Sequence, residues 1–553
     1  MKKSFLSLCL VLVIITTMTV LFACGDNGSN GGSNHEHAWD NGTVTKEATC
    51  SESGTLVYSC SDCSETKTED IVKLAHTEVT DSMVPATCTS TGLTEGKHCS
   101  VCNEVIVPQS IIYKTEHDYV NDVCTVCGYE IYTDGLVFSL NSGEADYSVV
   151  GYTGSNKDVV IPNKYKGLPV VAIGIEAFKE NSVIETIRIP NSVTTIEEKA
   201  FYECKELTAI TIPASVTVIK NGTFYKCENL DSVALSGNIR GIGNEAFMFC
   251  ESLGSITLPS TCESIGEDAF SCCSSFSSIN LPEGLTYIGP DAFHQTYLTS
   301  ITLPSTLNTI HASVFSNCDQ LRTVTISEGV QKIEGYAFRA CKALQTIHIP
   351  ASVTTVEAYA FAYCDVLKNI TVAENNLVYD SRNNCKGIVE TATNTLVVGG
   401  SSTTIYDTVT AIGEGAFFGS GVWSIYIPES VVTIGKSAFS QCKELNNITI
   451  PASVTEIADG LLAGCSYVRT IDIKGDVRRI GDSAFNGTIR LEKIILPATI
   501  TYIGERAFTN ASTNAIIYYR GNGMQWNEID NHDAVALSNY QNNGKMVFNY
   551  DGE

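Results

Sequence analysis

From about residue 178 onward, the apolar residues return in the same order about every 23 positions. The unit around Phe201 shows this order: an Ala-Phe pair, then Cys204 and Leu207, then Ile210 and Ile212 followed by a proline. Alternating apolar residues are typical of a strand with one buried face, and proline ends such a strand. Residues 197–203 are long enough only for a short helical turn. Each unit is therefore predicted to be a short helical turn followed by a short strand.

The anchor position, usually phenylalanine, occurs about fourteen times. Successive anchors lie 23 residues apart, except for two steps of 22 and one of 56 between Phe361 and Phe417. One unit cannot bury its own apolar residues, whereas stacked units bury them between parallel strands about 4.8 Å apart. The repeats therefore predict a solenoid, an α/β leucine-rich-repeat horseshoe with strands on one face and short helical segments on the other.

The repeat pattern also predicts the domain organisation of the C-terminal three quarters of the chain. The array spans residues 178–511, and the long step holds an insertion at about 373–410 that is interpreted as a strand pair. Terminal repeats need a polar outer face. Residues 131–177 are predicted to form the N-terminal cap, and residues 512–553, with Ile517, Tyr518, Tyr519 and Trp526, the C-terminal cap.

Residues 35–130 form a separate head that is rich in cysteine and histidine. Two approximate repeats each contain an Ala-Thr-Cys triplet, a Cys-x-x-Cys pair and a following histidine, and a third fragment keeps only Cys124 and Cys127. In the first repeat, residues 44–50 and 55–60 are predicted to form a hairpin that brings Cys50 beside the Cys-x-x-Cys turn. The head is therefore expected to consist of small β modules.

Structural zinc is the favoured interpretation of this head. Tetrahedral zinc accepts three thiolates and one imidazole, so the expected ligand sets are Cys50, Cys60, Cys63 and His76, and Cys88, Cys99, Cys102 and His117. Disulfides are the competing interpretation, because exported domains with paired cysteines normally oxidise them. Zinc is favoured because the histidines recur in phase with the cysteines. No cofactor is expected in the repeat array.

The N-terminus has the features of an export signal. Lys2 and Lys3 precede an apolar stretch over residues 5–22, and a Gly/Asn/Ser-rich tether follows at 24–34. Residues Leu21 to Cys24 resemble a bacterial lipobox, although Phe22 replaces the small residue usual there. We therefore expect a signal peptide at 1–23 and lipidation of Cys24. Plain secretion and a membrane-spanning helix are the alternatives, and threonines at 16, 17 and 19 weaken the latter.

Nine further cysteines lie three residues after an anchor. The same position also accepts Asn181, Thr296, Ser420 and Thr488, which indicates a buried slot for small side chains. We therefore expect these cysteines to be reduced packing residues rather than a redox or metal site. They are Cys204, Cys227, Cys250, Cys273, Cys318, Cys341, Cys364, Cys442 and Cys465.

Charge and motif content exclude several classes of function. The net charge of −26 argues against nucleic acid and anionic membrane surfaces as partners. His294, His311 and His348 occupy different repeat phases, and no nucleophile elbow or phosphate-binding glycine loop is present. We expect no catalytic residue and no small-molecule substrate, and a hydrolase remains only a remote alternative.

Outward strand positions are the remaining candidates for function. Most are Ser or Thr, which suit strands and could be mere scaffold. The least generic residues on or beside these rows are Arg188, His348, Trp423 and Tyr426. Trp423 and Tyr426 adjoin the insertion, so the best local binding site is expected there, although Trp423 could instead pack against the insertion.

The Ala-Phe-x-x-Cys-x-x-Leu repeats resemble those of the BspA-like group of bacterial surface leucine-rich-repeat proteins, from about residue 135 to the C-terminus. The resemblance implies cell-surface display and binding of host or other-cell proteins, without a reaction. The expected partners are extracellular or cell-surface proteins, with membrane attachment through a lipid anchor. A purely structural envelope protein without a specific ligand is the main alternative.

Overall fold

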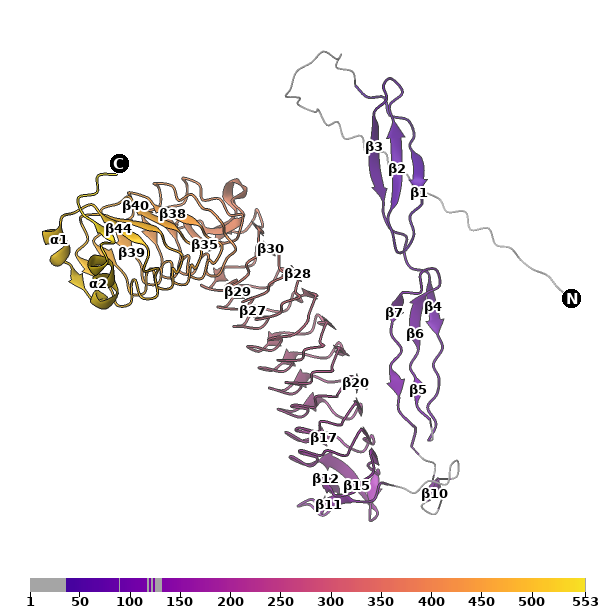
Figure 1. Cartoon of the computed structure of the whole chain (residues 1–553). Coiled ribbons are helices and arrows are strands. Elements are labelled where there is room, and N and C mark those ends of the chain that lie inside the picture. The colour runs from indigo at the N-terminus through magenta and orange to yellow at the C-terminus, as the bar shows by residue number, and fades with distance from the viewer. Residues whose placement is uncertain (1–35, 89, 117–118, 121–122, 125–131, 553) are drawn as a thin grey trace. The chain divides into compact units, whose positions relative to one another are not determined.

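The computed structural model describes residues 36–88, 90–116, 119–120, 123–124 and 132–552. The chain divides into two compact units (Figure 1). Unit 1 comprises residues 1–82 and 95–109, and unit 2 comprises residues 83–94 and 110–553. The predicted signal peptide, Cys24 and the tether lie outside the described residues. Among the described residues, no helix has both the length and the apolar character that crossing a bilayer requires.

Unit 1 contains two small antiparallel sheets. In the first sheet, β2 (Gly54–Ser59) pairs with β1 (Thr43–Lys46) on one side and β3 (Thr66–Ile71) on the other. This confirms the hairpin expected from the sequence and adds a third strand. In the second sheet, β6 (Gly96–Cys99) pairs with β4 (Glu78–Asp81) and β7 (Val105–Val107).

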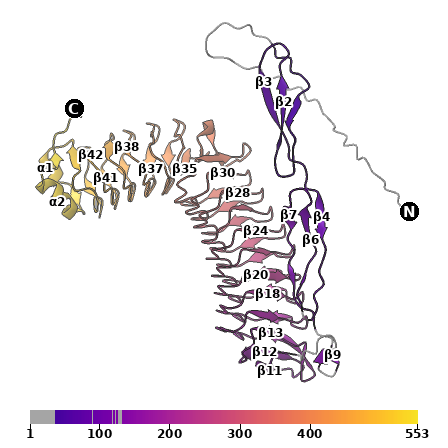
Figure 2. The ribbon, with the colours of Figure 1, turned by 45° about the vertical axis from the view of Figure 1, so that its right-hand side comes forward.

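Unit 2 is a parallel β-solenoid (Figure 2). It has about 16 turns, or coils, of about 23 residues each. The main strand row consists of β16 (Thr186–Arg188), β18 (Ala209–Ile212), β20 (Ser232–Leu235), β22 (Ser255–Thr257), β24 (Ser278–Asn280), β26 (Ser300–Thr302), β28 (Thr323–Thr325), β30 (Thr346–Ile349), β32 (Asn369–Val372), β38 (Asn447–Ile450), β40 (Thr470–Ile473), β42 (Lys493–Leu496) and β44 (Ile516–Tyr519).

Each turn adds a second, two-residue strand on another side of the coil. This row consists of β17 (Thr195–Ile196), β19 (Val218–Ile219), β21 (Gly241–Ile242), β23 (Ser264–Ile265), β25 (Tyr287–Ile288), β27 (Thr309–Ile310), β29 (Lys332–Ile333), β31 (Thr355–Val356), β36 (Ala411–Ile412), β37 (Thr433–Ile434), β39 (Glu456–Ile457), β41 (Arg479–Ile480), β43 (Tyr502–Ile503) and β45 (Asp530–Asn531). The strands within each row pair in parallel, which keeps equivalent residues of neighbouring coils in line.

The segments around the anchors are tight turns, not the short helical segments expected from the sequence. Residues two positions before and after each anchor have positive φ; around Phe201 these are Lys199 and Glu203, both at 56°. The amides of these three residues donate to carbonyls of the next coil, while the amides of Ala200 and Tyr202 donate to carbonyls three residues back. Because every second amide bonds to a neighbouring coil, the i to i−4 pattern of a helix cannot form.

The anchor phenylalanines form a continuous stack along the core. From Phe178 to Phe361, consecutive ring centroids lie 5.1–5.7 Å apart with nearly parallel planes. Each ring is buried together with the leucine, isoleucine and cysteine side chains of its coil. Stacking between identical turns therefore provides the burial that one turn alone cannot.

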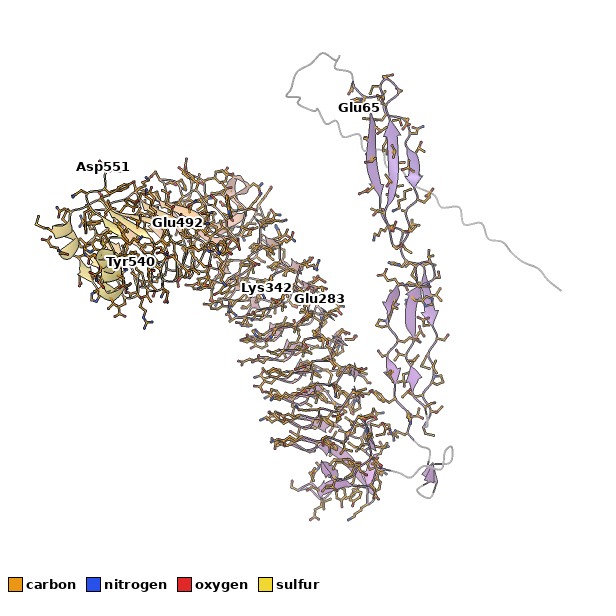
Figure 3. All side chains as sticks on the ribbon, in the orientation of Figure 1. Glu65, Glu283, Lys342, Glu492, Tyr540 and Asp551 are labelled. Carbon is orange, nitrogen blue, oxygen red and sulfur yellow. The ribbon has the colours of Figure 1, made fainter. Side chains whose placement is uncertain are left out.

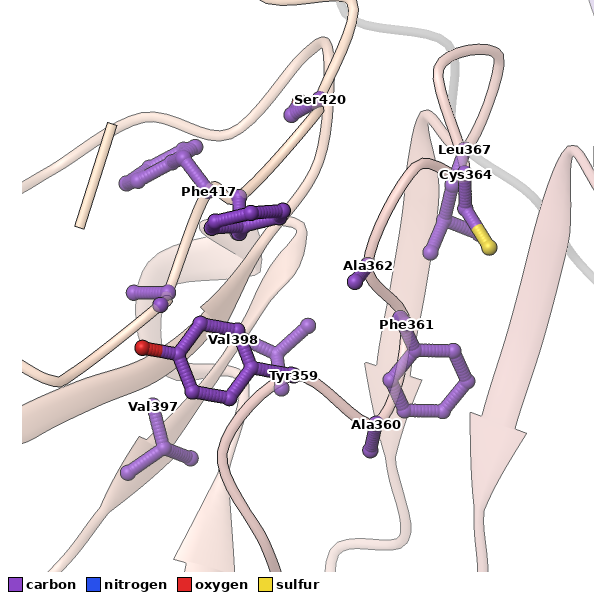
Figure 4. Close-up of a pocket in the computed structure, with 14 residues that line it drawn as sticks. Tyr359, Ala360, Phe361, Ala362, Cys364, Leu367, Val397, Val398, Phe417 and Ser420 are labelled. Carbon is purple, nitrogen blue, oxygen red and sulfur yellow. The ribbon is translucent and has the colours of Figure 1, made fainter. Parts of the chain in front are cut away.

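The insertion interrupts this stack. It contains β33 (Tyr379–Asp380), the one-turn η1 (Arg382–Asn384), β34 (Gly387–Glu390) and β35 (Thr395–Gly399), and β35 continues into the array by pairing with β36. The strand pair expected there is thus present, with a third strand added. Here the buried apolar residues separate into two clusters. A small pocket marks the joint, lined by Phe361, Val398 and Phe417 among others (Figure 4).

A glycine makes the joint possible. A Cβ atom on Gly399 would lie 2.2 Å from the ring of Phe417, the first anchor after the insertion. The side chain of Asn376 fastens the start of the insertion, because it donates to the carbonyls of Pro350 and Val353, both at 2.9 Å. The insertion is therefore packed into the solenoid rather than looped out from it.

Distinct elements close both ends of the array. At the N-terminal end, β11 (Leu136–Leu140) pairs with β12 (Tyr147–Tyr152), and β13 (Asp158–Val160), β14 (Lys164–Tyr165) and β15 (Leu168–Ile173) follow. At the C-terminal end, α1 (Gly523–Asn527), α2 (Ala534–Asn542) and β46 (Met546–Val547) cover the last coil. Trp526 and Tyr519 are buried there against one another.

The remaining short strands are β5 (Gly92–Leu93), β8 (Ile111–Ile112), β9 (Tyr119–Val120) and β10 (Val123–Cys124).

Candidate metal centres and interaction face

Four potential metal ligands meet in unit 1. They are Cys50 from the turn between β1 and β2, His76 from the segment before β4, Cys99 at the end of β6, and Cys102 from the turn that follows. The Sγ atoms of Cys50 and Cys99 are 3.5 Å apart, and His76 Nδ1 is 3.4 Å from Cys102 Sγ. All four ligand atoms lie within 4.8 Å of one another, so one ion could contact them all.

A second group contains three potential ligands, His37, Cys60 and Cys63. His37 Nδ1 lies 3.3 Å from Cys63 Sγ. In both groups the histidine precedes the second cysteine of its Cys-x-x-Cys pair by 26 residues. The two groups are therefore equivalent, except that the second has no counterpart of Cys50.

The two groups also share a carboxylate behind the histidine. His76 Nε2 lies 3.4 Å from Glu104, and His37 Nε2 lies 3.6 Å from Glu65, which is labelled in Figure 3. Each glutamate follows its Cys-x-x-Cys pair by two residues. Ligating histidines commonly donate their second N–H to a carboxylate, which fixes the ring orientation and tautomer.

The local environment shifts the pKa values of two thiols in the four-residue group in opposite directions. The side chain of Cys102 and burial together raise the pKa of Cys50 to about 11. Burial also acts to raise the pKa of Cys99, but the backbone N–H groups of Cys102 and Val101 outweigh it and lower that pKa to about 5. The Cys-x-x-Cys turn therefore favours the thiolate of Cys99, the form that binds metals.

These groups correct the ligand sets expected from the sequence. His76 does not join Cys60 and Cys63, because it opens the second sheet instead of closing the first. His37, which is in neither expected ligand set, takes that place. Cys88 belongs to neither group, and His117 lies outside the described residues. The equal 26-residue spacing was the sequence signal for the right partners, since the spacings from Cys63 to His76 and from Cys102 to His117 are unequal.

The nine repeat cysteines form a different and purely structural series. All nine are buried free thiols. Each Sγ donates to the backbone carbonyl of the anchor phenylalanine one coil earlier, as Cys250 does to Phe224 at 3.1 Å. Each thiol thus satisfies a buried carbonyl between two coils, in keeping with the packing role expected from the sequence.

The outward positions of the main strand row form a long exposed surface, which we call the strand face. Two residues of each coil contribute, such as Ser300 and Thr302, while the isoleucine or valine between them points inward. Apart from Ile495 in β42, these outward positions are exposed or half-buried, as the alternating pattern predicts. The face is rich in Ser and Thr. Of the candidate binding residues expected from the sequence, His348 is exposed and Arg188 is half-buried. His348 Nδ1 lies 2.9 Å from Thr371 Oγ1.

The main strand row is interrupted beside the insertion. Residues 421–428 form no strand, and β32 and β38 belong to different sheets on either side. Trp423 and Tyr426 lie in this gap with 65% and 73% of their surface exposed. This exposure argues against the alternative that Trp423 packs against the insertion. The two largest side chains expected on or beside the outward rows are therefore available for contact.

The histidines of the array do not converge on one site. His294 faces Asp291 at 3.5 Å, His311 faces Glu334 at 3.3 Å, and His348 faces Thr371. Acidic and basic side chains such as Glu283, Lys342 and Glu492 instead project into solvent along the array (Figure 3). Each of these histidines is therefore part of a separate local contact.

Comparison with known proteins agrees with this architecture. A family model described as a BspA type leucine rich repeat region, in six copies, matches residues 152–275, 263–388 and 400–515. A leucine rich cell surface protein from Faecalibacterium prausnitzii A2-165 is 30% identical, with a TM-score of 0.49, and the alignment covers 73% of this chain and 98% of that one. A leucine-rich repeat protein from Bacteroides ovatus ATCC 8483 is 26% identical with a TM-score of 0.50, covering 71% and 100% respectively. No curated protein matches the chain by sequence.

Proposed function

Since the chain belongs to the BspA-type leucine-rich-repeat family, we propose that it is a bacterial cell-surface protein that binds extracellular or cell-surface proteins through its strand face. The family supports an interaction role and a location at the cell surface. Its repeats stack into a regular, exposed surface in which each coil presents equivalent outward residues. Such a surface suits an extended partner that makes many weak contacts, with an avidity greater than that of any one contact.

The exposure of Trp423 and Tyr426 is the observation that carries the proposal. Both lie in the gap of the main strand row, where a partner meets two aromatic side chains among short polar ones. Tryptophan and tyrosine are enriched among the residues that dominate binding energy. The binding site is therefore centred beside the insertion and extends along the strand face toward His348.

We expect the double variant Trp423→Ala/Tyr426→Ala to bind at least about tenfold more weakly, because one aromatic hot spot alone contributes about 2 kcal/mol. The binding screen uses a panel of purified extracellular-matrix and cell-surface proteins. The affinity is then measured for each protein that binds. The matched control is Tyr297→Ala/Tyr467→Ala, since both tyrosines are exposed but lie outside the strand rows. Equal loss in both variants, or loss only in the control, contradicts the proposal.

A purely structural envelope role is the second candidate. The rows of Ser and Thr on the strand face favour this role, because side-chain pairs between neighbouring strands stabilise a sheet without any ligand. The binding screen separates the two candidates, since a purely structural protein binds no extracellular-matrix or cell-surface protein in a way that depends on Trp423 and Tyr426.

Attachment to the membrane through a lipid on Cys24 is part of the same proposal. It rests on the sequence, in which the apolar segment ends at Ala23 and Cys24 and a flexible tether follows. More than one acyl chain gives stable anchoring where a single chain does not. We expect the protein to enter the detergent phase on detergent partitioning and Cys24→Ser to move to the aqueous phase. Retention of the variant in the detergent phase refutes the anchor.

The head serves as a metal-stabilised spacer between this anchor and the array. Its two groups combine thiols with imidazoles, and zinc prefers this ligand set. Zinc is therefore the metal proposed for the head, with no cofactor in the repeats.

A further inference from the structure

The four-residue group draws its ligands from two separate sheets. Cys50 belongs to the loop of the first sheet, whereas Cys99 and Cys102 belong to the second. No strand of the first sheet pairs with a strand of the second among the described residues. The contact between the sulfur atoms of Cys50 and Cys99 joins residues that are 49 positions apart in the sequence.

Unit 1 has almost no hydrophobic core to hold these sheets together. Within its described part, the buried apolar residues are one alanine, Ala48, and three cysteines, Cys50, Cys60 and Cys99. Its valines are exposed or half-buried, with Val79, Val101, Val105 and Val107 all exposed. Small domains without an adequate core usually require disulfides or a metal for stability.

We propose that a single zinc ion bound by Cys50, His76, Cys99 and Cys102 joins the two sheets of unit 1 and that Glu104 orients its histidine. This inference deepens the proposed spacer role of the head, because it assigns the ion a specific structural task. Folding of the two sheets into one unit is then coupled to metal binding.

The geometry fits zinc more closely than a disulfide. Tetrahedral bond lengths of about 2.3 Å to sulfur and about 2.0 Å to nitrogen place two sulfurs about 3.8 Å apart and a sulfur and a nitrogen about 3.5 Å apart. The observed separations are 3.5 Å for Cys50 Sγ and Cys99 Sγ and 3.4 Å for Cys102 Sγ and His76 Nδ1. A disulfide needs about 2.05 Å between its sulfurs and leaves His76 and Glu104 without a role.

The carboxylate is an independent sign of a metal site. His76 turns Nδ1 toward the thiols and Nε2 toward Glu104, and His37 repeats this arrangement with Glu65. A disulfide or a surface ion pair does not require the two ring nitrogens to be divided in this way. A ligating histidine does, because its second N–H orients the ring and raises its basicity.

The first test is the zinc content of the full chain, purified under reducing conditions with zinc present. We expect Cys99→Ser to bind one zinc ion per chain fewer than the unmodified protein. The control is Cys272→Ser, which removes a half-buried cysteine of the array and should leave the zinc content unchanged. Unchanged zinc in Cys99→Ser, or a Cys50–Cys99 disulfide found by mass spectrometry, overturns the assignment.

The second test measures the coupling between the sheets by hydrogen exchange. We expect Cys102→Ser, a change in the second sheet, to accelerate exchange also in residues 43–59 of the first sheet, with no change in β18 or β20 of the array. If the acceleration is confined to residues 95–107, the ion is local and the joining role is wrong. The zinc measurement is independent, so structural metal in the head can survive that result.

Glu104→Gln provides a variant that keeps all four ligands and therefore the fold. As a positioning residue, Glu104 should change affinity rather than stoichiometry, and loss of such a partner typically weakens metal binding about 10–100-fold. Competition with a chromophoric zinc chelator measures this change. Glu95→Gln is the control, because Glu95 is an exposed carboxylate of the same unit outside the group. Equal affinities in the two variants contradict the role of Glu104.

Discussion

We expect Phe270→Ala to lower the free energy of unfolding of the array by about 3–5 kcal/mol. Phe270 is fully buried, and its ring centroid lies 5.3 Å from that of Phe247, 5.6 Å from Phe293 and 5.0 Å from Phe276. Hydrogen bonds between coils fix their separation, so the neighbours cannot collapse into the cavity left by the ring. Urea unfolding followed by far-ultraviolet circular dichroism measures the change.

The exposed Tyr297 provides the control for this measurement. It is 53% exposed and lies in the following coil, so Tyr297→Ala should change stability by less than about 0.5 kcal/mol. A loss below about 1 kcal/mol in Phe270→Ala indicates that the phenylalanine stack is not what holds the coils together.

The nine repeat thiols are expected to be nearly inert in the folded protein. Burial raises the pKa of Cys204 to about 12 and that of Cys318 to about 11, against an ordinary value of 9.0. A pKa three units higher lowers the thiolate fraction at pH 8 about 1000-fold. Iodoacetamide at pH 8 should therefore label none of the nine before unfolding and all of them in denaturant.

The half-buried Cys272 is an internal reference for the labelling experiment. Cys272 is not one of the nine repeat cysteines, and it should react with iodoacetamide first. Labelling of any of the nine at the rate of Cys272, or their recovery as disulfides, contradicts the packing role. The raised pKa values of Cys204 and Cys318 also set the sign of a pH effect: these two thiols stabilise the folded state fully below pH 9, and their contribution falls as the pH rises from 9 toward about 11–12.

Repetition made most of the array predictable from the sequence. Fourteen anchors in one phase indicate a stacked solenoid, and the alternation of residues such as Ile210 and Ile212 indicates which side of each strand is buried. The turns were less predictable. Their left-handed residues include Glu, Lys, Asp and Tyr as well as Gly, so residue type gave no consistent signal for the backbone conformation that prevents a helix.

The ligand grouping of the head illustrates a different difficulty. Sequence proximity suggested that His76 completes the module before it, whereas the strand order assigns it to the module after it. Cys50 then meets ligands from a separate sheet, a long-range contact that no local pattern contains. The exposure of Trp423 could likewise not be predicted from the sequence, because it depends on the gap in the main strand row beside the insertion.

We propose that the strand face is the binding surface of this protein. The affinity of Trp423→Ala/Tyr426→Ala for each protein bound by the unmodified chain, compared with that of Tyr297→Ala/Tyr467→Ala, tests it most directly. A loss of about tenfold or more in the first variant and no loss in the second is the predicted result. Unchanged binding by the first variant, with weakened binding by the second, would place the interaction outside the strand face.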